Sequence, residues 1–507
     1  MSYLLGIDLG TTGVKVLLVD KNGGLADSLT REYPLLTPRP GWAEQNPADW
    51  KENTLIALRE IRKRNKEKEI AAIGLTGQMH GAVLLDGKGE VIRPAILWCD
   101  QRTARETEEI HAIFGYEKFL SITGNPALTG FTAPKILWVK KNEAENFRKI
   151  SKILLPKDYL RFILTGDFFS DVSDASGTSL FEVRKRNWSQ EIIKGLQLKS
   201  EWLPEVKESV EVTGKISKET AAITGIKEGT PVVAGAGDQA ASAFGCGIIK
   251  EGIVSVTLGT SGVIFASTDS MKCEQEGKLH SFCHAVRGKW HLMGVMLSAG
   301  GSFRWLRDTL GKEEKEIGRK EGIDPYQLLT RQAEGVPAGS EGVIFLPYLA
   351  GERTPHQDPY ARGVFFGISL KTSKAHLIRS VLEGIAFGLN DSLKLMKEMG
   401  VKIEEVRIVG GGARSSFWRE IISSVFELPI YTLKAEEGSS YGAALLAGVG
   451  SGIFKDEKKA AKVVKIKEQT RPVEKQVKVY RKTYPLFGEI YTSLKKEFRR
   501  ISNIVEM

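Results

Sequence analysis

A six-residue pattern occurs twice in this chain, at positions that divide its 507 residues into two nearly equal parts. LGTTGV covers residues 9–14 and LGTSGV covers residues 258–263. Each copy follows one apolar β-rich run and leads into another, which is typical of two strands joined by a tight glycine turn. This recurrence in matching surroundings predicts two structurally similar halves with a boundary near Gly247. We therefore expect one domain over residues 1–247 and a second over residues 248–507.

Strands and helices are expected to alternate within each half. Residues 69–78 and 231–237 indicate buried strands that end in small residues, and residues 404–426 indicate a strand, a glycine turn and a helix. A long helix is predicted over residues 374–399, and Pro485 predicts the start of a last helix. The expected buried stripe of that last helix is Phe487, Ile490, Leu494, Phe498 and Ile501. Alternation of this kind favours an α/β architecture with mainly buried sheets.

Charge and composition exclude several classes of protein. The net charge is +10, but residues 455–482 alone hold eleven Lys and Arg against four Asp and Glu, a concentration typical of a solvated face. No helix-turn-helix, finger or RNP motif accompanies it, so we expect no nucleic-acid partner. No apolar run reaches the roughly 18 residues that span a bilayer, and the four cysteines are too few for a disulfide scaffold. With no basic leader ahead of the first apolar run, a cytoplasmic protein without membrane contact is expected.

The first glycine turn carries groups suited to a phosphorylated ligand. GIDLGTTGVK covers residues 6–15. Backbone N–H groups of a glycine turn can approach phosphate oxygens closely, and the hydroxyls of Thr11 and Thr12 add donors. Asp8 at the strand end can hold Mg²⁺ directly or through water, because Mg²⁺ prefers oxygen ligands. A plain hairpin is the alternative, but the second copy favours two hairpins that hold one polyphosphate.

A lone acid among small residues marks a second candidate site. VVAGAGDQAAS covers residues 232–242, and Asp238 is its one ionisable residue. One interpretation is a simple loop, because Asp and Gly form turns and Asp often caps helices. The other is that the small residues leave room for a ligand on which the acid acts.

Three further motifs place small or polar residues at strand or helix ends. VGGGAR (residues 409–414) follows a predicted strand and precedes a helix, which suits a nucleotide, although no GxGxxG or Walker pattern is present. EEGSSYGAALLAG (residues 436–448) is more typical of close helix packing than of a ligand site. Met79 and His80 lie between two glycines at a strand's end, where α/β ligand sites form, but a structural histidine is an equal alternative.

Taken together, these motifs resemble the FGGY family of carbohydrate kinases, part of the larger actin, hexokinase and heat-shock chaperone ATPase superfamily. The family's signatures also fit GFTAPKILWVKKN (residues 130–142) and GVFFGISLKTSKAHLIRSVLE (residues 363–383). The resemblance runs in order from residue 3 to residue 448. It implies two similar actin/hexokinase-like (ribonuclease H-like) α/β domains with a cleft between them, and an enzyme that uses ATP and Mg²⁺.

The resemblance also implies roles for individual residues. Asp238 is expected to act as the catalytic base and Asp8 to help hold Mg²⁺. The residues expected to bind the nucleotide are Thr11, Thr12, Lys15, Thr260, Ser261, Gly411, Gly412 and Ser415. The residues expected to shape the sugar site are Met79, His80 and Gln239, with Lys157 and Asp158 as weaker candidates.

Within the family, motifs such as GQMHGA, PAILWCDQR and LLPKDYLR resemble the members that phosphorylate D-xylulose to D-xylulose 5-phosphate. Many of those members have Asn where this chain has Gln239, so another ketose or polyol, such as ribulose or glycerol, is the alternative substrate. A nucleotide-switched, actin-like ATPase is a remote alternative, because the sequence contains no segment for a binding domain or polymer contact. A homodimer is expected from the resemblance alone. One group of residues fits no common zinc spacing: His280, Cys283, His284 and His291.

Overall fold

The computed structural model describes residues 2–435 and 437–505, which form two compact units. Unit 1 consists of Met1–Lys250, Ser267–His291 and Glu437–Lys465, and unit 2 of Glu251–Ala266, Leu292–Glu436 and Ile466–Met507. Unit 1 therefore combines the chain up to Lys250 with two segments from the second half of the chain.

Unit 1 is built on a mixed sheet with the strand order β13-β14-β5-β1-β2-β3. Strand β1 is antiparallel to β2 and parallel to β5 along its whole length. A short strand, β15 (Ala236–Gly237), also pairs with β5 in parallel. The strand bounds are β1 Ser2–Leu9, β2 Gly13–Asp20, β3 Leu25–Glu32, β5 Glu69–Gly77, β13 Val212–Lys215 and β14 Pro231–Val233.

The main sheet of unit 2 includes, in order, β19, β17, β16, β22, β23 and β24. Strand β16 is antiparallel to β17 and parallel to β22, and β22 is in turn parallel to β23. The bounds are β16 Gly252–Leu258, β17 Gly262–Thr268, β19 Trp290–Met296, β22 Ile403–Val409, β23 Ile430–Leu433 and β24 Ile466–Thr470.

The two sheets share one topology. In each, a hairpin joined by the repeated glycine turn lies beside a parallel strand, then a second parallel strand, then an antiparallel one. The order β2-β1-β5-β14-β13 in unit 1 corresponds to β17-β16-β22-β23-β24 in unit 2. This correspondence confirms the prediction of two structurally similar halves.

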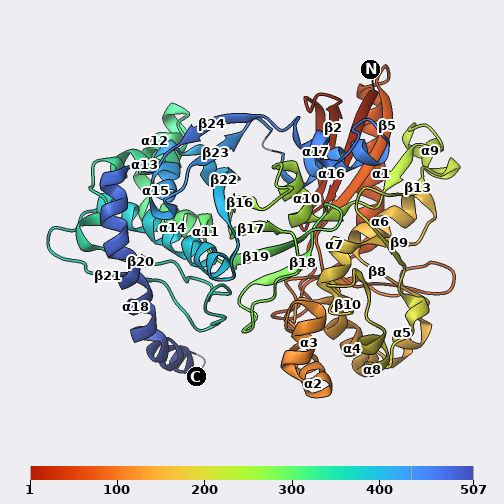
Figure 1. The fold of residues 1–507 in the computed structure, drawn as a ribbon, viewed down its shortest axis with the longest axis horizontal. Helices are drawn as coiled ribbons and strands as arrows, with labels where there is room; N and C mark the ends of the chain where they lie inside the picture. Colours follow the sequence, from red (N-terminus) through yellow and green to blue (C-terminus); the bar gives the residue numbers. More distant parts are fainter. Residues whose placement is uncertain (1, 436, 506–507) are drawn as a thin grey trace. The chain divides into compact units, whose positions relative to one another are not determined.

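Helices cover the sheet of unit 1, as Figure 1 shows for α1 beside β2. Helix α1 (Pro47–Arg64) begins after Asn46, whose side chain accepts the N–H of Ala48, and it buries Trp50 in the main core of the unit. The other helices of unit 1 are α2 Ala104–Phe114, α3 Tyr116–Thr123, α4 Thr132–Asn142, α5 Ala144–Lys149, α6 Pro156–Thr165, α7 Val172–Ala175, α8 Gln190–Gly195, α9 Lys218–Thr224, α10 Asp238–Gly245, α16 Gly438–Gly450 and α17 Glu457–Ala461. Its short strands are β4 Glu44–Gln45, β6 Val83–Leu85, β7 Ala95–Ile96, β8 Lys152–Leu154, β9 Phe169–Asp171, β10 Phe181–Glu182, β11 Asn187–Trp188, β12 Glu205–Lys207 and β18 His280–Cys283.

Helix α16 packs against strands and against α10 at backbone distance. A Cβ atom added to Gly6 or Gly74 would lie 1.9 Å from a carbonyl oxygen of α16, and one added to Gly442 would lie 1.8 Å from the carbonyl oxygen of Ala241. Only glycine permits so close an approach. The predicted close packing of this small-residue helix is therefore confirmed, although Glu436, the first residue of the motif, lies outside the described residues.

Unit 2 is built around α14 (Lys374–Glu398), a 25-residue helix that confirms the predicted one. Figure 1 shows α11, α14 and α15 in the same part of the molecule, and α14 contacts both of the others. The remaining elements are α11 Gly300–Leu310, α12 Lys312–Glu321, α13 Pro325–Glu334, α15 Ser416–Phe426, α18 Glu474–Val505, β20 Ile344–Leu346 and β21 Val364–Phe366.

The prediction for the last helix was wrong at its start. Pro485 lies inside α18, which begins at Glu474. The residues before Pro485 are held to α14, because the hydroxyl of Tyr480 donates to Glu383 (2.9 Å) and that of Tyr484 to Asp391 (2.5 Å). These contacts offset an interior proline, which costs about 3 kcal/mol. The predicted stripe holds at Phe487, Ile490 and Phe498, which are buried, whereas Leu494 is half-buried and Ile501 is 56% exposed.

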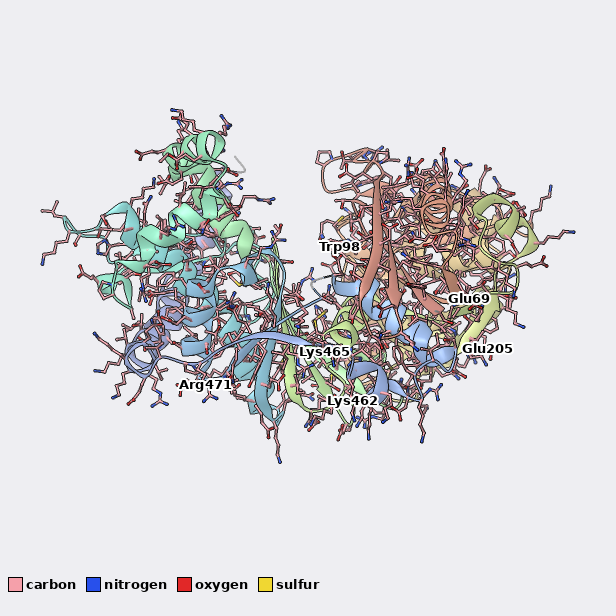
Figure 2. The ribbon with its side chains drawn as sticks, turned by 90° about the horizontal axis from the view of Figure 1, so that it is seen from above. Glu69, Trp98, Glu205, Lys462, Lys465 and Arg471 are labelled. Atoms are coloured by element: carbon pink, nitrogen blue, oxygen red, sulfur yellow. The ribbon has the colours of Figure 1, made fainter. Side chains whose placement is uncertain are left out.

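The basic side chains of the segment 455–482 are solvated, as predicted. All eleven of its Lys and Arg residues are exposed, including Lys462, Lys465 and Arg471, which Figure 2 labels. Of the helices built from the described residues, none has both the length and the apolarity that crossing a bilayer requires.

Candidate active site

Asp238 is the first residue of helix α10 and follows directly on β15, so the simple-loop interpretation was wrong. Its Oδ1 accepts the backbone N–H of Gln239 (2.7 Å). Burial, together with the nearby carboxylate of Asp8, raises the pKa of Asp238 to about 7. The carboxyl thus exchanges its proton near neutral pH, as a general base requires.

Asp8 lies near the end of β1, in the same unit as Asp238. Its Oδ2 accepts the hydroxyl of Ser439 at the start of α16. Its Oδ1 is shielded from solvent and has no hydrogen-bond donor among the described residues. Burial raises the pKa of Asp8, while the Ser439 hydrogen bond and the charge of Lys15 act in the opposite direction. An oxygen in this state is suited to a cation or its water shell.

Lys15 faces Asp8 across the hairpin, because the two residues are paired in the register of β1 and β2. Its ammonium group forms an ion pair with Glu437, two residues before Ser439. The segment at the start of α16 therefore contacts both Asp8 and Lys15.

The first glycine turn is held by a chain of side-chain hydrogen bonds. Thr11 Oγ1 donates to Gln78 Oε1 (3.1 Å) and accepts the indole N–H of Trp98 (2.9 Å), which is labelled in Figure 2. Gln45 donates to the Thr11 carbonyl (2.6 Å) and accepts from Gln78 (2.8 Å). The Thr11 hydroxyl has one O–H group, and that group already donates a hydrogen bond to Gln78. It is therefore not the free donor that the sequence suggested. Thr12 is exposed at the turn.

Met79 and His80 bring the GQMHG loop against the segment that carries Asp238. His80 has a positive φ of 67°, its Nδ1 lies 2.6 Å from the carbonyl oxygen of Gly177, and its ring stacks on Phe131 at 4.2 Å. Met79 is buried, and its Sδ would lie 2.8 Å from a Cβ atom added to Gly237. Met79, one of the two predicted sugar-loop residues, therefore lies against Gly237, the residue before the predicted base.

In unit 2, four of the predicted nucleotide residues surround one cavity of about 600 Å³. They are Thr260, Gly411, Gly412 and Ser415. The predicted strand, glycine turn and helix are confirmed, since β22 leads through Gly411–Arg414 into α15. Ser415 accepts the N–H of Trp418 (3.2 Å) and so caps α15. Phe303 and Tyr326 add aromatic surface to the cavity wall.

The second glycine turn is supported through its backbone. The carbonyl oxygen of Thr260 accepts the N–H groups of Ala299 (3.0 Å) and Gly301 (2.9 Å), and Gly259 donates to Ser261 (3.1 Å). A Cβ atom on Gly300 would lie 2.4 Å from the Gly259 carbonyl, so this approach requires glycine. Ser261 shapes the turn but does not line the cavity.

Lys157 and Asp158 lie in the interior of unit 1. Both are fully buried and form an ion pair at 2.5 Å, and Asp171 lies 3.0 Å from the Lys157 ammonium. A fully buried pair cannot touch a sugar without rearrangement, so neither residue is placed to bind one directly.

The cysteines and histidines form no metal centre in the described part of the chain, where no group of three or more His, Cys, Asp or Glu is arranged to hold a metal ion. His280 and His284 are buried and bonded to protein oxygens, those of Asn125 and Ile248. A magnesium ion would therefore depend on one or two carboxylates together with water and phosphate oxygens.

Five polar residues of this site were not among the predicted ones: Gln45, Gln78, Trp98, Glu437 and Ser439. Gln78 and Trp98 adjoin or lie within motifs that the sequence offered, GQMHGA and PAILWCDQR. Gln45 lies in no such motif, and only the folded chain brings it to the turn.

Comparison with known protein families shows that this chain is a carbohydrate kinase. Residues 3–245 match the FGGY family of carbohydrate kinases, N-terminal domain, and residues 254–451 match the C-terminal domain of the same family. The chain belongs to the FGGY family.

The similar proteins and solved structures include kinases named for several different substrates. The chain is 37% identical to the xylulose kinase of Bacillus subtilis over 99% of this chain and all of that protein, and 32% identical to a gluconokinase of the same organism over 99% and 98%. A structure described as a xyloylose kinase from Brucella ovis superposes with a TM-score of 0.90 at 38% identity, covering 97% and 99% of the two chains. Plasmodium falciparum glycerol kinase with ADP gives 0.87 at 25% identity, covering 96% and 98%.

Proposed function

We propose that this chain transfers the γ-phosphoryl group of ATP to a hydroxyl of D-xylulose, giving D-xylulose 5-phosphate and ADP, and so acts as a xylulokinase. The observation that carries the proposal is the position of Asp238. Its carboxyl titrates near neutral pH at the start of α10, beside Asp8 and against the Met79 loop. The xylulose kinases among the relatives support the choice of sugar.

In this proposal Asp238 is the general base. The sugar oxygen forms a bond to the γ-phosphorus, the bond from that phosphorus to the oxygen bridging it to the β-phosphate breaks, and Asp238 accepts the hydroxyl proton. ADP leaves with the bonding electrons. Base catalysis of this kind contributes about 10²- to 10⁴-fold, and positioning and charge stabilisation contribute the rest.

Asp8 is proposed to hold Mg²⁺, directly or through water. The fit rests on its shielded Oδ1, which lacks a donor among the described residues, while Ser439 fixes Oδ2. The ion would neutralise charge on the phosphate oxygens. Lys15 and the backbone N–H groups of Thr11 and Thr12 are proposed to bind phosphate in the same unit.

The nucleotide is proposed to occupy the cavity of unit 2. Its volume of about 600 Å³ suits an adenosine, and the backbone of Gly411 and Gly412 leaves room for close approach. Thr260 at its edge, with Ser261 in the same turn, is proposed to contact phosphate. The ADP complex of a glycerol kinase with the same fold supports nucleotide binding by this architecture.

A second candidate is a kinase for another polyhydroxy acceptor. Gln239 follows the proposed base, and a gluconokinase is among the relatives at 32% identity. Met79, His80 and Gln239 are proposed to determine which acceptor is used.

The test is ADP release by the purified protein with Mg-ATP and each of D-xylulose, L-xylulose, D-ribulose, L-ribulose, glycerol and D-gluconate. We expect the highest kcat/KM with D-xylulose. Preference for another acceptor would support the kinase assignment but reject D-xylulose as the substrate. If no acceptor increased turnover, the kinase assignment would be rejected in favour of an actin-like ATPase.

The matched variants are Asp238→Ala and Asp86→Ala. Asp86 is an exposed carboxylate that accepts backbone N–H groups in a surface turn. We expect the first variant to lose kcat by at least 10²-fold while it still binds ATP, and the second to retain wild-type turnover. Near-normal turnover of Asp238→Ala would reject the base assignment.

A further inference from the structure

The segment that carries Asp238 cannot position itself through side chains. Residues 234–237 are Ala-Gly-Ala-Gly, so no side chain in this stretch extends beyond Cβ. Gly235 has a φ of +73°, and a Cβ atom there would lie 1.9 Å from the carbonyl oxygen of Leu75. A base must be held to within about 0.5 Å to be effective. The precision must therefore come from groups that bind the backbone of this segment.

A cluster of charged side chains lies behind the segment, and each is fully buried. Its members are Lys157, Asp158, Arg161, Asp171 and Asp174. Burying charges costs several kcal/mol per ion unless attraction and hydrogen bonds offset it, so such a cluster is weak evidence for stability. What these residues contact is more informative.

The two cations of the cluster bind carbonyl oxygens at the end of β14 and just beyond. Arg161 donates to the Val233 oxygen (3.3 Å) and also to the Ala234 oxygen. Lys157 donates to the same Ala234 oxygen at 3.4 Å. Both cations come from α6, so this helix fixes the entry to the small-residue segment.

Asp171 fixes the exit of the segment through two serines. The N–H of Gly237, the residue before Asp238, donates to Ser173 Oγ (3.1 Å), and that hydroxyl donates to Asp171 Oδ2 (2.6 Å). Asp171 Oδ2 also accepts Ser209 Oγ (3.0 Å), and the Ser209 carbonyl accepts the N–H of Gly235 (2.9 Å).

We propose that Ser173 and Asp171 are positioning residues that set the place of the Asp238 carboxylate, with Arg161 and Lys157 holding the preceding carbonyls. The proposal rests on the proposed role of Asp238 as base. Neither Ser173 nor Asp171 touches substrate in this account, because both are fully buried. The motif LLPKDYLR, which contains Lys157 and Arg161, then serves the base rather than the sugar.

The test compares Ser173→Ala with Thr224→Val. Thr224 is a matched control, because its buried hydroxyl also accepts a backbone N–H, that of Ile226 (3.2 Å), and donates to a carbonyl (2.7 Å), but in helix α9. We expect Ser173→Ala to lower kcat by about 10- to 100-fold with both KM values within about 3-fold of wild type, because misplacement by about 1 Å can cost 10²-fold. Thr224→Val should keep wild-type kcat.

A double-mutant cycle with Asp238→Ala separates positioning from a general structural effect. If Ser173 acts through Asp238, Ser173→Ala should have no further effect on the residual turnover of Asp238→Ala. An equal loss in both backgrounds, or wild-type kcat for Ser173→Ala, would overturn the proposal. Near-normal turnover of Asp238→Ala would instead reject the role of Asp238 as general base. Failure of the positioning hypothesis can therefore be distinguished from failure of the proposed function.

Ser209→Ala covers the case in which Ser173→Ala does not fold. It removes one hydrogen bond to Asp171 and leaves the Gly235 contact, which uses the Ser209 backbone. We expect a loss of kcat of about 3- to 10-fold that also vanishes in the Asp238→Ala background. A loss that persists there would count against the proposal.

Discussion

Replacing Asp238 by Asn should change how stability depends on pH. Folding raises the pKa of this carboxyl from its ordinary 3.8 to about 7, chiefly through burial. Below about pH 4 the group is protonated in both the folded and the unfolded chain and does not change the free energy of unfolding. As the pH rises from 4 to 7 the unfolded chain loses its proton first, so the wild type loses stability that the neutral Asn variant keeps.

The size of this effect follows from the difference between the two pKa values. About three pKa units correspond to an upper limit of about 4 kcal/mol, of which about 2.5 kcal/mol falls between pH 5 and pH 8. The Asp238 residue is partly exposed, so solvent screening reduces this, and we expect about 1.5 to 2.5 kcal/mol. For a unit of roughly 300 residues the melting temperature should change by about 2 to 4 °C.

The assay is thermal unfolding of both proteins from pH 5 to pH 8, without substrates. The Tm of Asp238→Asn minus that of the wild type should increase across this range. Asp86→Asn is the control: hydrogen bonds from the N–H groups of Glu90 and Lys88 lower the pKa of Asp86, so its contribution changes only below about pH 4. A difference that stays flat or decreases for Asp238→Asn would refute the reasoning.

Three further predictions concern the fold, the metal and the sugar. Gly442→Val should destabilise unit 1 by more than about 3 kcal/mol, because even a Cβ atom there would lie 1.8 Å from a carbonyl oxygen of α10. The control Gly488→Val has open space around it and should lose about 1 kcal/mol of stability or less, so similar Tm values for the two variants would contradict the prediction. Ser439→Ala should raise the Mg²⁺ concentration for half-maximal turnover by about tenfold, because Asp8 loses the donor that orients it; an unchanged Mg²⁺ titration would contradict this. Gln239→Asn should change the ratio of kcat/KM between acceptor sugars while the KM for ATP stays the same, and an unchanged ratio would remove Gln239 from the sugar site.

The two hairpins were predictable from sequence because their signal is local. A glycine turn between two β-rich runs specifies a hairpin from about ten residues, and the repeat then indicates the shared topology of the two sheets. The start of α15 after Gly411–Arg414 was predictable for the same reason. The motif around Asp238 indicated an acid with space around it, but not that it begins a helix.

Contacts between residues far apart in sequence were not predictable in this way. Thr11 carries a hydroxyl in a glycine turn, and sequence alone suggested a free donor. In the fold, this hydroxyl donates a hydrogen bond to Gln78, which is 67 residues away in the sequence. Pro485 likewise has the local signature of a helix start, and only the hydrogen bonds of Tyr480 and Tyr484 to α14 explain why the helix continues through it.

The small residues around Asp238 and the buried charges behind it have one physical explanation. Glycine and alanine let β5 and α16 approach at backbone distance, which brings Asp8 and Met79 to the base. The same lack of side chains removes the packing that normally fixes a backbone, so hydrogen bonds must replace it. In a dry interior, hydrogen bonds that involve charged groups are about twice as strong as neutral ones, which is why cations and a carboxylate perform this task. A site that needs both close approach and precision therefore accepts the desolvation cost of these buried charges.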